Sequence, residues 1–61
     1  MWVILVTYKN KQANVSQEAY KTYLEARQEI MKKENIKTIT DYIYYDIDNE
    51  IQYELKNVYI K

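Results

Sequence analysis

Residues 41–48 read DYIYYDID, with three tyrosines and two isoleucines set among aspartates. Successive side chains of a β-strand point to opposite faces of a sheet. The alternation therefore predicts Ile43, Tyr45 and Ile47 on the face that a helix covers. Tyr42 and Tyr44 are predicted on the opposite, uncovered face, where they are available to a partner.

Two strands are predicted around this stretch, over residues 36–47 and 51–60, with a loop from Asp48 to Glu50 between them. A three-residue loop places apolar residues opposite each other on the helix-covered face. The expected pairs are Ile47 with Ile51, Tyr45 with Tyr53, and Ile43 with Leu55. A two-residue turn at Asp48 and Asn49 would set Tyr45 against Gln52 and Ile43 against Glu54, which fills the core poorly. The three-residue loop is the predicted one, and it needs a left-handed residue near its end.

The chain before this hairpin predicts one strand and one helix. Residues 1–9 are mostly β-branched, aromatic or aliphatic and read as a strand, and residues 10–14 read as a polar loop. Ser16 is expected to cap a helix from Gln17 to about Glu34, and Asn35 is expected to end it. The apolar stripe of that helix recurs every three or four residues, at Ala19, Tyr20, Tyr23, Leu24, Ala26, Ile30 and Met31.

These elements predict a single small α+β domain over residues 1–61, in the order β-α-β-β. One helix is expected to pack on one face of a three-stranded sheet, with the first two strands running in the same direction. Either the second or the third strand can lie in the centre. The layout resembles that of dodecins, small oligomeric flavin binders, and this resemblance implies a small-ligand-binding oligomer. It assigns no residue to a flavin, because no flavin-contacting motif is matched.

The composition excludes several classes of site. The 61 residues include nine basic and nine acidic side chains, but no cysteine, histidine, glycine or proline. Disulfides and thiolate or imidazole metal sites are thereby excluded, and the balanced charge argues against a dedicated DNA binder. The stretch DIDNE at residues 46–50 resembles the start of a calcium loop, but Ile51 occupies the position of its glycine. We expect no metal, no cofactor and no enzymatic activity, because no acid–base constellation stands out.

A sheet with a single helix leaves its second face uncovered. That face is expected to bear Tyr42, Tyr44, Val58, Ile60 and one side of the first strand, either Trp2, Ile4, Val6 and Tyr8 or Val3 and Leu5. The first strand is also expected at a sheet edge, and long apolar edges invite pairing. Soluble monomers rarely expose so large an apolar patch, so a homodimer or higher homo-oligomer is predicted. The alternative is a monomer whose terminal strands curl over the second face.

Arg27 lies in the middle of the apolar helix stripe, where a lone guanidinium is costly to bury. Its stem is expected to pack on Tyr23, with the head reaching Glu34 or water. The alternative is that Arg27 meets a carboxylate of a partner. The predicted partner-binding or dimer-interface residues are Trp2, Ile4, Val6, Tyr8, Arg27, Tyr42, Tyr44, Val58 and Ile60.

Tyrosine, tryptophan and arginine are the residue types enriched in interface hot spots. They favour a non-enzymatic, homodimeric protein-binding module over a single-stranded nucleic-acid binder that stacks bases on Tyr42 and Tyr44 near Lys37 and Lys56. The abundant Lys, Ile, Asn and Tyr have AT-rich codons and point to a low-GC bacterium or its phages. We therefore predict a cytoplasmic phage or mobile-element accessory protein that inhibits a host enzyme or defence protein. No membrane segment is predicted, because the apolar run at residues 1–8 is too short to span a bilayer.

Overall fold

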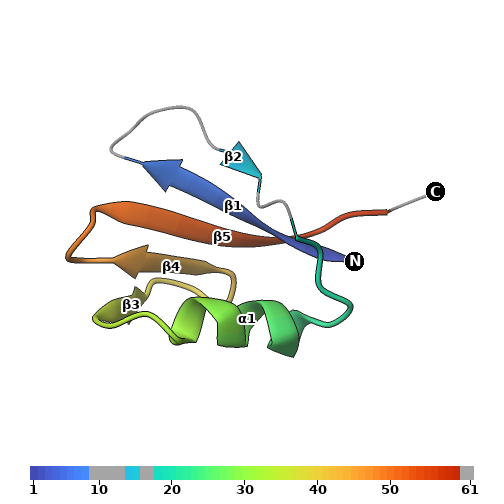
Figure 1. Cartoon of the computed structure of the whole chain (residues 1–61), viewed down its shortest axis with the longest axis horizontal. Coiled ribbons are helices and arrows are strands. Elements are labelled where there is room, and N and C mark those ends of the chain that lie inside the picture. Colours follow the sequence, from blue (N-terminus) through green and yellow to red (C-terminus); the bar gives the residue numbers. More distant parts are fainter. Residues whose placement is uncertain (9–13, 16–17, 60–61) are drawn as a thin grey trace.

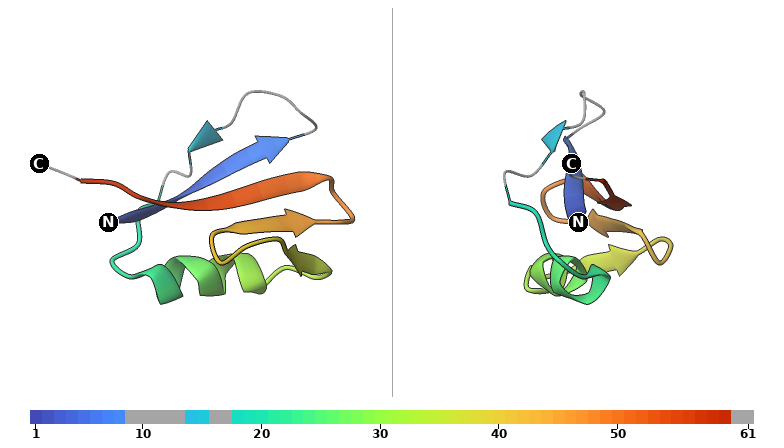
Figure 2. Two further views of the ribbon diagram at one scale, coloured as in Figure 1. Left: turned by 180° about the vertical axis from the view of Figure 1, so that it is seen from behind. Right: turned by 90° about the vertical axis from the view of Figure 1, so that its right-hand side faces the viewer.

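The computed structural model describes residues 1–8, 14–15 (backbone only) and 18–59. The elements in chain order are β1 (Trp2–Tyr8), β2 (Asn14–Val15), α1 (Tyr23–Met31), β3 (Ile36–Thr38), β4 (Ile43–Asp46) and β5 (Ile51–Asn57). They form an antiparallel sheet of order β2-β1-β5-β4-β3 (Figure 1), and α1 lies on one side of it (Figure 2). The predicted α+β class and single covering helix are confirmed. The predicted three-stranded sheet is wrong, because four strands of three to seven residues pair, and the two-residue β2 adds to their edge.

Strand β5 is central and pairs antiparallel with both β1 and β4. Of the two arrangements left open by the sequence, the last strand in the middle is therefore the observed one, and β1 and β4 run in the same direction. The outer edge of β1 is partly covered as well. Val15 and Asn14 pair with Leu5 and Val6, and Tyr20 exchanges two backbone hydrogen bonds of 2.6 and 2.7 Å with Trp2. The expected long open edge is thus shortened, because these partners satisfy its backbone groups.

The strand predicted over residues 36–47 is instead two strands joined by a turn at residues 39–42. The Thr40 hydroxyl accepts hydrogen bonds from the backbone N–H groups of Tyr42 and Ile43, at 3.2 and 3.1 Å. Threonine side chains favour such local turns over extended backbone. The chain therefore folds back at this point and β3 becomes the edge strand beside β4.

The hairpin between β4 and β5 has the register that the sequence argued against. Tyr44 pairs with Tyr53 and Tyr45 pairs with Gln52, so the loop spans four residues, 47–50. The Asp46 carboxylate accepts from the backbone N–H of Asn49 at 3.2 Å and from its side-chain amide at 2.9 Å. The residue that ends the loop is Glu50, whose φ of 55° is left-handed. This local turn chemistry accommodates a register that differs by one residue from the hydrophobic expectation.

This shift exchanges the two faces of β4. Tyr44 is fully buried on the helix side, and the buried apolar core consists of Ile4, Ala26, Ile30, Tyr44, Tyr53 and Leu55. Ile47, which was predicted to face the helix, is 54% exposed, and Ile39 in the turn before β4 is 52% exposed. The uncovered face bears Ile43 and Tyr45 from β4 and, by the pairing of β1 with β5, Val3 and Leu5 from β1. The prediction that Tyr44 faces away from the helix is therefore wrong, and of the two alternatives for the first strand the observed one places Val3 and Leu5 on the uncovered face and buries Ile4.

Helix α1 is shorter than predicted at both ends. It is capped by Thr22, whose hydroxyl accepts from the backbone N–H of Glu25 at 3.2 Å, and it ends at Met31. The predicted cap Ser16 and start Gln17 lie outside the described residues. Residues 18–20 are not helical because Tyr20 pairs with Trp2 in the sheet. Asn35 has the left-handed φ of 55° that asparagine tolerates, but the helix ends at Met31 with Lys32 as its cap, so the prediction that Asn35 ends the helix is wrong.

The left-handed Glu50 yields a prediction for stability. A residue with a side chain loses about 1 kcal/mol or more in this conformation, whereas glycine does not. We expect Glu50→Gly to have a free energy of unfolding about 0.5–1 kcal/mol higher than that of Glu50→Ala in urea titrations, since the glycine adds unfolded-state entropy that offsets part of the gain. Glu50→Ala is the control, because it removes the side chain without relieving the backbone. Equal effects of the two variants would contradict the explanation.

Asp46 yields a prediction for pH dependence. Hydrogen bonds from Asn49 hold the pKa of this carboxyl below its ordinary 3.8, against the opposing effect of burial. Folding favours the ionised form of the carboxyl group. Its contribution to the free energy of unfolding is therefore complete above about pH 4 and is lost as the pH falls toward the lower folded-state pKa. We expect Asp46→Asn to have a lower urea midpoint than the wild type at pH 7. At pH 3 the difference between the two midpoints should be smaller. The exposed Asp41→Asn is the control, and a constant difference at both pH values would refute the assignment.

Candidate functional site

Three aromatic side chains from separate segments meet beside the start of α1. The rings of Trp2 and Tyr42 are stacked, with centroids 6.1 Å apart and planes 5° from parallel. Tyr23 meets both rings edge-on, at 5.4 Å from Trp2 and 5.6 Å from Tyr42. We call Trp2, Tyr23 and Tyr42 the aromatic cluster. Trp2 and Tyr23 are half-buried, whereas Tyr42 is 51% exposed, so the cluster joins the core to the surface.

A hydrogen-bond network formed by tyrosine hydroxyl groups supports the aromatic cluster. The Tyr44 hydroxyl donates to the backbone carbonyl of Asp41 at 2.6 Å, and the single proton of the Tyr23 hydroxyl is shared between the same carbonyl and the Tyr44 oxygen. The two hydroxyl oxygens are 3.1 Å apart. Mainly because of this hydrogen bond with Tyr44, with further contributions from burial, the pKa of Tyr23 rises to about 12. The network ties α1 to the loop before β4 and thereby fixes the position of Tyr42.

Arg27 joins the same network one helical turn after Tyr23. Its Nε donates to the Tyr44 hydroxyl at 3.1 Å, so the observed partner is this hydroxyl and not the expected Glu34. The side chain is half-buried, yet it forms no ion pair with any residue that the structure describes. Because a guanidinium has five donors, Arg27 retains donors at its outer nitrogens beside the aromatic cluster.

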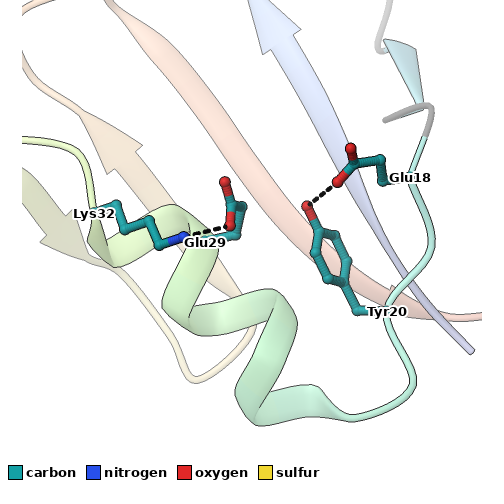
Figure 3. Close-up of polar contacts among 4 residues, drawn as sticks. All are labelled: Glu18, Tyr20, Glu29 and Lys32. Atoms are coloured by element: carbon teal, nitrogen blue, oxygen red, sulfur yellow. Dashed lines mark hydrogen bonds and ion pairs between the residues drawn. The ribbon is translucent and has the colours of Figure 1, made fainter.

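Acidic side chains lie on one flank of this region. Figure 3 shows Tyr20, on the segment leading into α1, with its hydroxyl directed at the Glu18 carboxylate, and the Glu29–Lys32 ion pair on the helix. The two contacts measure 3.5 and 3.1 Å. Burial raises the pKa of Tyr20, and the negative charges of Glu29 and Glu18 raise it further. Lys32, which pairs with Glu29, partly offsets these negative charges.

The structure brings some of the predicted site residues together and separates others. Trp2 and Tyr42 lie together in the aromatic cluster, and Arg27 and Tyr44 lie in the hydroxyl network that supports it. Tyr44 and Ile4 are nevertheless buried in the core, and Val6 packs against it. Tyr8 is 43% exposed at the opposite end of β1. Val58 is half-buried and exchanges hydrogen bonds with Met1, and Ile60 lies outside the described residues. Tyr23 was not among the predicted site residues, although its four-residue spacing from Arg27 places both on one helix face.

The raised pKa of Tyr23 leads to a test of the hydroxyl network. Tyr44→Phe removes the hydrogen bond that is its largest cause, so the pKa of Tyr23 is expected to fall from about 12 toward 10.0. In the wild type, the raised pKa means that the neutral Tyr23 side chain contributes to the stability of the fold. This contribution is fully present below pH 10 and is lost as the pH rises toward 12. NMR titration of ¹³C-labelled tyrosine resolves the individual side chains. Tyr45→Phe, on the uncovered face, should leave Tyr23 unchanged, and an unaltered titration in Tyr44→Phe would refute the network.

No protein-family model, no curated protein and no solved structure matches this chain. Among the described residues, no group of three or more histidine, cysteine or acidic side chains is arranged to hold a metal ion. Within the same residues, no helix has both the length and the apolar character needed to cross a membrane. Function must therefore be inferred from the geometry of the chain's own residues.

Proposed function

We propose that this chain is a non-enzymatic protein-binding module whose binding surface is the aromatic cluster together with Arg27. The observation that carries the proposal is a half-buried arginine without a carboxylate partner among the described residues, joined through the hydroxyl network to a Trp–Tyr stack whose tyrosine ring is exposed. Tryptophan, tyrosine and arginine dominate interface hot spots because they bury large areas with few rotatable bonds. Both Trp2 and Tyr42 are held in place by neighbouring rings, so little conformational entropy is lost on binding.

The chemistry of this surface defines the partner. Tyr42 offers an exposed aromatic ring, and Arg27 offers free N–H donors beside it. A protein that presents an apolar side chain next to an Asp or Glu carboxylate would satisfy both groups. A carboxylate accepts two parallel hydrogen bonds from a guanidinium, and such charge-assisted bonds are about twice as strong as neutral ones.

The two alternatives lose support for specific reasons. A base-stacking platform of Tyr42 and Tyr44 requires both rings at the surface, and Tyr44 is fully buried. The dodecin-like layout requires the order β-α-β-β, whereas this chain has the additional strands β2 and β3. A flavin-like ligand therefore has no remaining basis in the topology.

The biological role that we propose with this binding is inhibition of a host enzyme or defence protein by a phage or mobile-element accessory protein. It rests on the balanced charge and on the abundance of Lys, Ile, Asn and Tyr, which have AT-rich codons, and the geometry adds only the surface.

Capture from a bacterial lysate with a tagged chain tests the binding surface. Tyr42→Ala truncates the exposed ring, and Arg27→Met keeps the aliphatic stem while removing the charge. Each variant is expected to reduce capture of a discrete protein by at least about tenfold, as hot-spot truncations do. Quantitative mass spectrometry of the captured proteins provides the measurement.

Tyr8→Ala is the matched control, because Tyr8 has a similar exposed fraction and lies about 20 Å away along β1. It should capture the same protein as the wild type. Capture that is equal in all four chains, or that yields nucleic acid alone, would contradict the proposal. Circular dichroism of each variant establishes that the fold is retained.

A further inference from the structure

On the side of the sheet that faces away from α1, the central strand carries charged side chains and its two neighbouring strands carry apolar ones. We call this side the open sheet face. Pairing places on it Val3, Leu5 and Thr7 of β1, Gln52, Glu54 and Lys56 of β5, Ile43 and Tyr45 of β4, and Lys37 of β3. The central strand is thus polar on this face, and the strands on both sides of it contribute apolar side chains.

The register aligns charged and apolar residues in adjacent rows. Val3 lies directly opposite Lys56, and Leu5 lies directly opposite Glu54. Glu54 and Lys56 are two residues apart on one face, about 7 Å along the strand. Neither of them forms an ion pair with another residue in the described part of the chain. Val3, Leu5, Ile43 and Tyr45 are only half-buried, so apolar surface remains beside two unpaired charges of opposite sign.

We propose that the open sheet face binds a second copy of this chain, with the two β5 strands stacked antiparallel across a two-fold axis. The axis lies between the sheets, perpendicular to the strands, at the level of Leu55. Glu54 of one protomer then faces Lys56 of the other, and the symmetry repeats this pair. The same operation brings Leu5 of one protomer over Val3 of the other. A single arrangement therefore matches the charges and the apolar side chains together, as an isologous interface requires.

The charges also select this arrangement over its alternative. A two-fold axis parallel to the strands would stack Glu54 on Glu54 and Lys56 on Lys56, and like charges in contact across an interface cost several kcal/mol. Packed sheets are about 10 Å apart and cross at roughly 30°. Glutamate and lysine side chains are long enough to meet across that distance.

The inferred dimer leaves the aromatic cluster free. Trp2, Tyr23 and Tyr42 lie on the helix side of the sheet, so a dimer joined through the open sheet face carries two aromatic clusters on its outer sides. Such a bivalent protein binds a paired or repeated target far more tightly than one copy does. Because the two surfaces share no residue, self-association and target binding can each fail without the other.

Sedimentation equilibrium between about 10 μM and 1 mM tests the dimer, since a small interface of this kind is expected to have a dissociation constant on the order of 10–100 μM. Glu54→Lys alone and Lys56→Glu alone each place like charges together in both symmetric pairs. Each is expected to raise the dissociation constant at least about tenfold. The double exchange, Glu54→Lys with Lys56→Glu, restores opposite charges across the interface and should restore the dimer.

Glu34→Lys and Lys21→Glu are the charge-matched controls, because both side chains are exposed outside the open sheet face, and they should leave association unchanged. A chain that stays monomeric at about 1 mM would overturn the proposal. So would a dimer that tolerates both single reversals, or one that the double exchange fails to restore, since either result places the interface elsewhere. Circular dichroism of the double exchange separates loss of association from loss of fold.

Discussion

The buried hydroxyl of Tyr44 is the constraint on which the rest of this structure depends. A buried hydroxyl without a partner costs roughly 1–3 kcal/mol, a large share of the stability available to a small domain. Here the Asp41 carbonyl, the Tyr23 hydroxyl and Arg27 Nε all lie around it. These groups come from the loop before β4 and from α1, so one hydroxyl joins the helix to the sheet.

The position of Tyr44 sets the register of the hairpin and hence both surfaces of the molecule. With Tyr44 opposite Tyr53 on the helix side, Tyr45 and Glu54 must lie on the other side. The same network holds Tyr42 against Trp2 at the surface. The proposed target-binding surface is therefore continuous with the core, whereas the residues on the open sheet face follow from the register alone.

Several local features were readable from the sequence, although the prediction used only some of them. Asn35 is left-handed, a conformation that asparagine tolerates, although it does not end the helix as predicted. The pattern of Thr22 followed three residues later by Glu25 is a capping-box signature, and it marks the true helix start better than Ser16 does. Thr40 and the Asp46–Asn49 pair carry ordinary turn chemistry. Hydrophobic alternation was given more weight than these turn residues, and for this reason the strand over residues 36–47 was predicted as continuous.

The sequence by itself determined the α+β class, a single amphipathic helix, the final hairpin and the aromatic character of the surface, because each follows from composition and local periodicity. Only the tertiary structure decided which tyrosines are buried. Alternation permits two registers that differ by one residue and exchange the two faces of the strand. The choice between them depends on hydrogen-bond partners for the Tyr44 hydroxyl that lie up to 21 residues away in sequence. Contacts over that separation exist only once the helix has packed on the sheet.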